Sequence, residues 1–119
     1  MSELKRARRV YICSPLRGVG RYNDPKENER LAEMLCRIAC IYGYAPFAPH
    51  LYFPRFLNDR HPPQRRLGLR AGLCFLEICD EVWVYTRRGI SEGMQGEIKA
   101  AKGLSIPVVW DPPVWRAVS

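Results

Sequence analysis

The sequence predicts a three-layer α/β sandwich of the Rossmann/flavodoxin-like kind, with a short parallel sheet of four or five strands. Two observations predict it. Short, nearly continuous apolar runs rich in β-branched and aromatic residues alternate with segments whose apolar residues recur at three- and four-residue spacing. Apolar strands joined by helical crossovers form parallel sheets that are covered on both faces. The 119 residues fit one domain, residues 1–119, and are too few for two.

The expected elements run strand, helix, strand, loop, helix, strand, helix, strand. The expected strands are residues 9–13, 44–48, 81–85 and 106–110, and the expected helices are residues 25–42, 67–78 and 92–103.

Local signals set the ends of the first and last helices. Asp24 supplies a capping carboxylate, Pro25 suits the first helical position, and Gly43 ends the helix. Ser91 caps the last helix, which ends at Gly103. These signals indicate the first and last residues of the two helices.

The middle of the chain is less regular. Residues 49–63 contain four prolines, two histidines and three aromatic residues, which fits a lid or a subunit contact as well as a core segment. In the helix that follows, an apolar side is expected to be buried, and its members are Leu69, Leu73, Leu76 and Ile78.

The composition narrows the classes of partner. Nineteen basic and twelve acidic residues give a net charge of +7, which suits an anionic ligand or a solubilising surface. The five cysteines are an odd number with no zinc-site spacing, and no apolar stretch approaches the roughly 20 residues that span a membrane. We expect a reduced, cytoplasmic protein that uses neither a metal nor a cofactor and does not bind membranes.

Three loops are expected at one edge of the sheet, because ligands of parallel α/β sheets bind beyond the carboxyl ends of the strands. The first loop offers Ser14, Arg17 and Gly18, which suit phosphate binding but also an ordinary turn with a basic edge. The third loop leads into a helix whose free N–H groups favour an anion. That helix has Gly93 and Gly96 in its first turns, where glycine costs about 1 kcal/mol relative to alanine.

A family resemblance joins these segments. Tyr11, the loop Cys13-Ser14-Pro15-Leu16-Arg17-Gly18, Asp80 and the run Ser91-x-Gly93-Met94-x-Gly96-Glu97 resemble the nucleoside 2-deoxyribosyltransferase superfamily, which includes the 2′-deoxynucleoside 5′-monophosphate N-glycosidases. The likeness runs from Val10 to Val109. The segments PFAPHLYFPRFL and CDEVWVY are similar to an uncharacterised phage and bacterial branch of this superfamily.

The resemblance implies roles for individual residues. Glu97 matches the nucleophile that forms a glycosyl-enzyme ester, and Tyr11 matches the tyrosine that orients it. The phosphate contacts that the resemblance implies are Ser14, Arg17, Gly18 and Ser91. The residues themselves add Gly93, which clears space beside the helix, and His50, which suits a base or sugar contact or a half-buried structural histidine. Asp80, which suits a site or a turn cap, and Glu92 are further candidates. The family's second catalytic carboxylate falls at Gly72, so the sequence departs from the family pattern there.

Three functions follow as hypotheses. The first is an enzyme that cleaves or transfers at an N-glycosidic bond of a nucleotide or nucleoside, in a homo-oligomer. The second is a non-catalytic nucleotide-binding or sequestering protein, which the missing carboxylate at Gly72 favours. The third, a basic nucleic-acid-binding module, is disfavoured because no charged recognition helix is present.

Overall fold

A computed structural model of the chain describes residues 6–118. Its centre is one parallel sheet of four strands in the order β2-β1-β3-β4. The strands are β1 (Arg9–Cys13), β2 (Ala45–Phe47), β3 (Glu81–Val84) and β4 (Val108–Trp110). This order and the helical crossovers confirm the predicted flavodoxin-like α/β fold.

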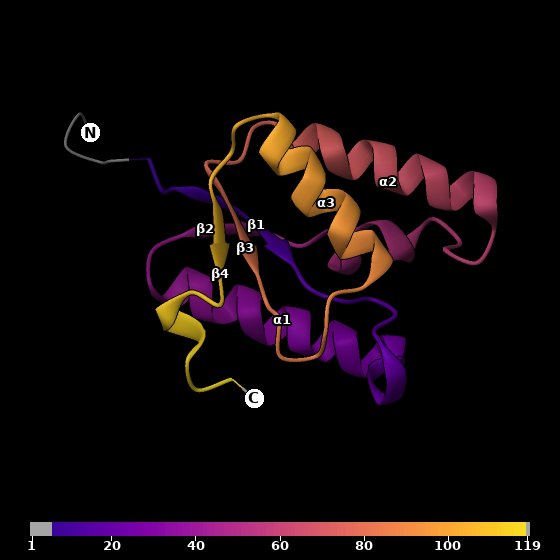
Figure 1. Cartoon of the computed structure of the whole chain (residues 1–119), viewed down its shortest axis with the longest axis horizontal. Helices are drawn as coiled ribbons and strands as arrows, with labels where there is room; N and C mark the ends of the chain where they lie inside the picture. The colour runs from indigo at the N-terminus through magenta and orange to yellow at the C-terminus, as the bar shows by residue number, and fades with distance from the viewer. Residues whose placement is uncertain (1–5, 119) are drawn as a thin grey trace.

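The three α-helices make the outer layers (Figure 1). Helix α1 (Pro25–Ile41) covers one face of the sheet, and α2 (Pro62–Leu76) and α3 (Glu92–Gly103) lie on the other. The predicted caps hold, since the Asp24 side chain accepts a hydrogen bond from the N–H of Lys26 and the Ser91 side chain accepts one from the N–H of Met94.

The alternation of β1 sends successive side chains to two separate cores. Val10 and Ile12 pack against α1 and the buried Trp115. Tyr11 and Cys13 point to the other face, where they join the core that α3 covers. This division places Tyr11 and Cys13 next to the helix that carries Glu97.

Helix α2 differs from the expectation in two ways. It begins at Pro62, five residues before the expected start, because two prolines occupy the first helical positions, where proline fits. The prediction of its buried side was wrong for three of four residues. Leu76 is buried, but Leu69, Leu73 and Ile78 are between 37% and 54% exposed.

The topology determines where a ligand site lies. From β1 the chain crosses to β2 over one face and returns to β3 over the other, so the connections diverge between β1 and β3. In sheets of this order the crevice at the carboxyl ends of those two strands binds ligands. No helix within residues 6–118 combines the length and apolar character that crossing a membrane requires.

Candidate functional site

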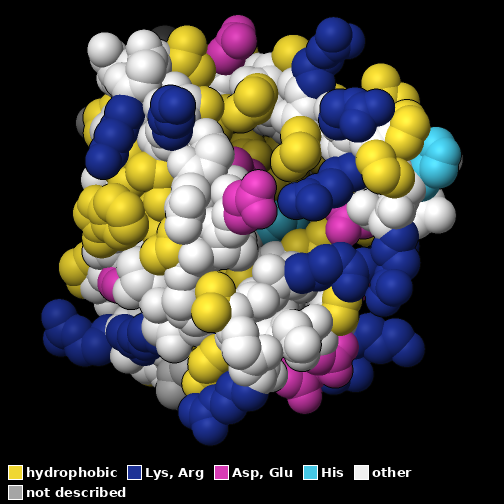
Figure 2. Space-filling model, turned by 45° about the vertical axis from the view of Figure 1, so that its right-hand side comes forward, with side chains coloured by type: hydrophobic (Ala, Val, Ile, Leu, Met, Phe, Trp, Pro, Cys, Tyr) yellow, Lys and Arg dark blue, Asp and Glu magenta, His cyan; other side chains and the backbone are white. Residues whose placement is uncertain are grey.

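A cavity of about 490 Å³ opens at the carboxyl ends of the strands, within the size range of small-molecule sites. Its walls come from the segments after β1, β2 and β3 and from the inner side of α2. Figure 2 shows the hollow in this face of the molecule, with arginine and lysine side chains along one side and hydrophobic side chains above it.

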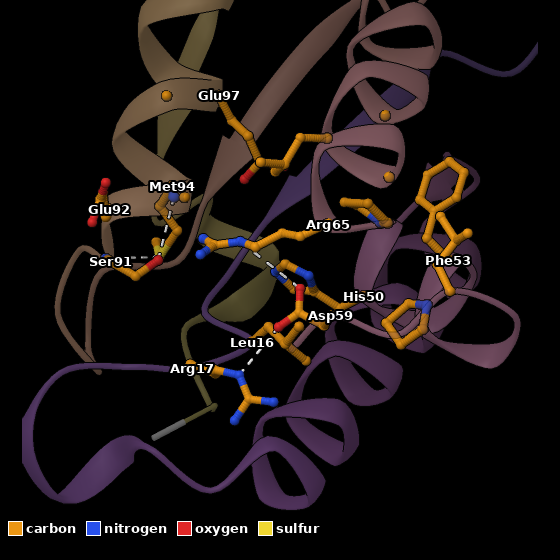
Figure 3. Close-up of a pocket in the computed structure, with 18 of the residues that line it drawn as sticks. Leu16, Arg17, His50, Phe53, Asp59, Arg65, Ser91, Glu92, Met94 and Glu97 are labelled. Carbon is orange, nitrogen blue, oxygen red and sulfur yellow. Dashed lines mark hydrogen bonds and ion pairs between the residues drawn. The ribbon is translucent and has the colours of Figure 1, made fainter. Parts of the chain in front are cut away.

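Glu97 is the buried carboxylate of the cavity. It extends from α3 into the hollow, as Figure 3 shows, and is only 8% exposed. The hydroxyl of Tyr11 donates a hydrogen bond to Oε2 of Glu97, and the thiol of Cys13 lies 3.4 Å from Oε1 and donates to it. Both oxygens are therefore held from the same strand.

Burial controls the ionisation of this cluster. Removal from water raises the pKa of Glu97 from 4.5 to about 7, although the hydrogen bonds from Tyr11 and Cys13 oppose the rise. Burial, followed by the nearby Glu97 charge, raises the pKa of the Tyr11 hydroxyl and of the Cys13 thiol well above their usual values. Tyr11 and Cys13 therefore remain protonated donors, while Glu97 changes charge near neutral pH.

A second charged group lies at the mouth of the cavity. The carboxylate of Asp59 is 3.1 Å from Nε of Arg17 and 4.0 Å from Nε of Arg65. Figure 3 shows the three side chains together, with Arg17 and Arg65 reaching Asp59 from different elements. Both guanidiniums are partly exposed, so an arriving anion can reach them by displacing Asp59.

His50 forms part of the cavity floor. Its Nε2–H donates to the backbone carbonyl of Ser14, which leaves Nδ1 as the acceptor of a neutral ring. Burial lowers the pKa of His50, outweighing the hydrogen bond and the charge of Asp59. At neutral pH His50 is therefore uncharged and joins the loop after β2 to the loop after β1.

The start of α3 forms the wall beside Glu97. Ser91, Glu92, Gly93 and Gly96 all line the cavity. The Ser91 oxygen accepts the N–H of Met94 at 3.3 Å, which leaves its hydroxyl hydrogen free for a ligand. A Cβ at Gly93 or Gly96 would meet no atom within 4 Å. These glycines therefore leave space for a ligand.

The opposite wall is the inner side of α2, where Gly68, Leu69, Gly72 and Leu73 line the cavity. A Cβ at Gly72 would lie 3.4 Å from the hydroxyl oxygen of Tyr11 and 3.8 Å from Cε2 of Phe53. The Gly72 backbone is thus next to the Tyr11–Glu97 pair, and this wall has no acidic side chain facing that pair.

Three residues named from the sequence lie outside the cavity lining. Ser14 is fully buried, and only its carbonyl reaches the site, through His50. Gly18 serves the loop itself, since a Cβ there would lie 2.2 Å from the carbonyl oxygen of Tyr22. Asp80 directly precedes β3, at the amino end of that strand and so away from the cavity. Its carboxylate accepts a hydrogen bond from the backbone N–H of Arg9 at 2.7 Å.

The sequence interpretation missed the parts of the site that depend on distant segments. Asp59 lies in the proline-rich stretch, where no pattern links it to Arg17. Arg65 suits a solvated arginine or a phosphate contact to a neighbouring subunit, and its sequence position does not place it beside Asp59. Cys13 had a usable signal, because a residue two positions after Tyr11 in a strand lies on the same face. Within residues 6–118, no group of three His, Cys, Asp or Glu side chains is arranged to hold a metal ion.

The fold and the site together define a flavodoxin-like α/β protein with a buried carboxylate in a ligand-sized cavity at the switch point of its sheet. A family model described as "Domain of unknown function (DUF7768)" matches residues 8–111, and the chain belongs to this family. A search of the curated proteins finds no match.

A solved structure shares the fold. It is a 2-deoxyribosyltransferase from the psychrotolerant bacterium Bacillus psychrosaccharolyticus, which superposes with a TM-score of 0.67 over 86% of this chain and 70% of that chain. The two sequences are 16% identical, so the likeness concerns the fold.

Proposed function

We propose that this protein cleaves or transfers at the N-glycosidic bond of a nucleotide or nucleoside, with Glu97 as the nucleophile. The observation that carries the proposal is the placement of Glu97: a buried carboxylate, held at both oxygens by Tyr11 and Cys13, faces a cavity of about 490 Å³. The fold shared with a 2-deoxyribosyltransferase supports the same class of reaction.

The reaction proceeds by double displacement. A carboxylate oxygen of Glu97 attacks the anomeric carbon, the bond to the base nitrogen breaks, and its electron pair leaves with the base. A second nucleophile, either water or another base, then attacks the anomeric carbon of the ester and releases Glu97 as the carboxylate. The hydrogen bonds from Tyr11 and Cys13 fix the carboxylate in one orientation before the attack.

The charged groups at the mouth suit the phosphate of a nucleotide. Arg17 and Arg65 are already drawn toward one carboxylate, Asp59, and a phosphate offers the same guanidiniums more oxygen atoms. The hydroxyl hydrogen of Ser91 and the N-terminal end of α3 are further donors along the same wall.

The test is base release from a panel of nucleosides and their monophosphates, in deoxy and ribo forms, followed by chromatography. Glu97→Gln is expected to abolish base release, because the amide keeps the shape but is not a nucleophile. Glu77→Gln removes an exposed carboxylate at the end of α2 and serves as the matched control. Equal loss in both variants would reject the proposal, as would no release by the parent protein from any substrate when nucleotides with a cationic base are included in the panel.

A second candidate function rests on the α2 wall. Because Gly72 brings no carboxylate beside Tyr11, the cavity also suits a protein that binds a nucleotide without turning it over. Calorimetry on the same panel separates the two functions, since the sequestering protein binds tightly and releases no base.

A further inference from the structure

Breaking an N-glycosidic bond leaves an electron pair on the ring nitrogen of the departing base. A neutral purine or pyrimidine base is a poor leaving group unless a side chain gives it a proton, and such a proton is worth about 10²–10⁴-fold in rate. The proton donors of the cavity therefore limit which bases can leave.

Two titratable side chains of the cavity, Tyr11 and His50, already donate their hydrogen in hydrogen bonds to other groups. The Tyr11 hydroxyl donates to Glu97, and burial keeps it from losing its proton. The Nε2–H of His50 donates to the carbonyl of Ser14, and the buried ring is neutral, with Nδ1 bare. Neither side chain has a free acidic proton to offer.

The three carboxyl groups are no better placed as acids. Asp59 is engaged in ion pairs with the guanidiniums of Arg17 and Arg65 at the mouth of the cavity. Glu92 is exposed to solvent in the first turn of α3. Glu97 must itself be ionised to attack.

The wall that faces the Tyr11–Glu97 pair has no acid either. Gly72 is the residue of α2 beside the Tyr11 hydroxyl. None of the α2 residues that line the cavity is an acid: they are Gln64, Arg65, Gly68, Leu69, Gly72 and Leu73. Among the described residues that line the cavity, none is positioned to protonate a departing base.

From this arrangement we infer the substrate class, on the basis of the function proposed above: the site cleaves N-glycosides whose base is already a cation, such as a pyridinium or an N-alkylated purine. Glu97 forms the ester bond as the carbon–nitrogen bond breaks, and the electron pair neutralises the ring, which leaves without a proton. Water then hydrolyses the ester, and its extra proton passes to the solvent.

The charges of the cavity suit such a substrate. Its lining contains two arginines, Arg17 and Arg65, against three carboxyl groups, Asp59, Glu92 and Glu97, although the whole chain has a net charge of +7. Negative charge on the wall stabilises a cationic ring, and Phe53 adds an aromatic face. The two arginines remain available to the phosphate of the same substrate.

The experiment compares matched substrates that differ in the charge of the base. Guanosine 5′-monophosphate is compared with its 7-methyl derivative, each in its ribo and deoxyribo form. Nicotinamide mononucleotide is added as a substrate whose base is a pyridinium cation. The rate of spontaneous base release is subtracted from each measurement. Gly72→Asp places an acid beside Tyr11, while Gly72→Asn adds the same bulk without one. Thermal unfolding confirms that each variant is folded.

The parent protein is expected to cleave the cationic substrates at least about 100-fold faster than the neutral partner, and Glu97→Gln to abolish the reaction. The neutral-to-cationic rate ratio should rise at least about tenfold in Gly72→Asp relative to Gly72→Asn. Cleavage of neutral and cationic substrates at similar, Glu97-dependent rates would overturn this inference and leave the proposed function standing. If Glu97 does not matter, or nothing is cleaved, both fail.

Discussion

Tyr11 on β1 and Glu97 on α3 are 86 residues apart in the chain, yet the tyrosine hydroxyl donates a buried hydrogen bond directly to the glutamate carboxylate. This bond favours the ionised form of a carboxyl group whose pKa burial raises to about 7. This contact between a strand and a helix, together with the hydrogen bond from Cys13, opposes the effect of burial on the charge of Glu97.

Tyr11→Phe tests that dependence. Losing the donor removes a hydrogen bond to a charged group, which raises the pKa of Glu97 and moves the pH midpoint of base release upward by about one pH unit or more. The measurement is the pH profile of the rate, which rises through the pKa of Glu97 in the parent protein. Tyr44→Phe, in the core on the other face of the sheet, should leave the profile in place.

Glu97 also links stability to pH. Its folded pKa of about 7 exceeds the ordinary value of 4.5, so between these values the unfolded chain has lost a proton that the folded chain keeps. The free energy of unfolding therefore falls as pH rises through this window, by on the order of 3 kcal/mol. Urea unfolding at pH 4.5 and pH 8 measures it.

Glu97→Gln should lack this loss and unfold at a higher urea concentration than the parent protein at pH 8. Parallel loss of stability in the two proteins across the same window would show that Glu97 does not ionise in its buried position.

Alanine substitutions of the glycines in α3 distinguish effects on the stability of the protein from effects on ligand binding. Gly96→Ala should stabilise the protein by about 1 kcal/mol, because alanine is the better helix former, and should raise KM because the new methyl group enters the cavity. Gly103→Ala, at the end of the same helix and away from the cavity, is the control and should leave KM unchanged. An unchanged KM in Gly96→Ala would mean that the ligand does not approach this wall.

Asp59→Asn tests whether Asp59 competes with the ligand for the arginines. Without the carboxylate, Arg17 and Arg65 are free, so KM for monophosphates should fall by about threefold or more. KM for the matching nucleosides, which have no phosphate, is the internal control. A fall of the same size for both kinds of substrate would place Asp59 at the base or sugar rather than at the phosphate.

Local chemistry made much of the fold predictable. Ser91 and Asp24 cap their helices as expected, and the apolar runs became the four strands, because each signal acts within a few residues. Helix α2 was expected, but its buried side was not predicted correctly, since Leu69 and Leu73 line a cavity rather than a core. A hydrophobic pattern cannot distinguish a cavity wall from a packed interior.

The positions of cavity residues could be predicted only where those residues lie in one continuous segment of the chain. The run from Ser91 to Glu97 and the residues of β1 could be placed from the order of the strands. The ion pair of Arg17 with Asp59 joins residues 42 apart through a loop of irregular structure, so no periodicity brings them together. Ser14 and Gly18 were expected as ligand contacts, but Ser14 is fully buried and Gly18 is required by the close approach of the Tyr22 carbonyl, so neither lines the cavity.

The most direct measurement is the capture of the glycosyl-enzyme ester. The protein is mixed with its substrate, quenched in acid during turnover, digested and analysed by mass spectrometry. We predict the added mass of the sugar, with its phosphate where the substrate is a monophosphate, on the peptide that contains Glu97, and its absence in Glu97→Gln. Steady base release that leaves the Glu97 peptide unmodified and persists in Glu97→Gln would contradict the account.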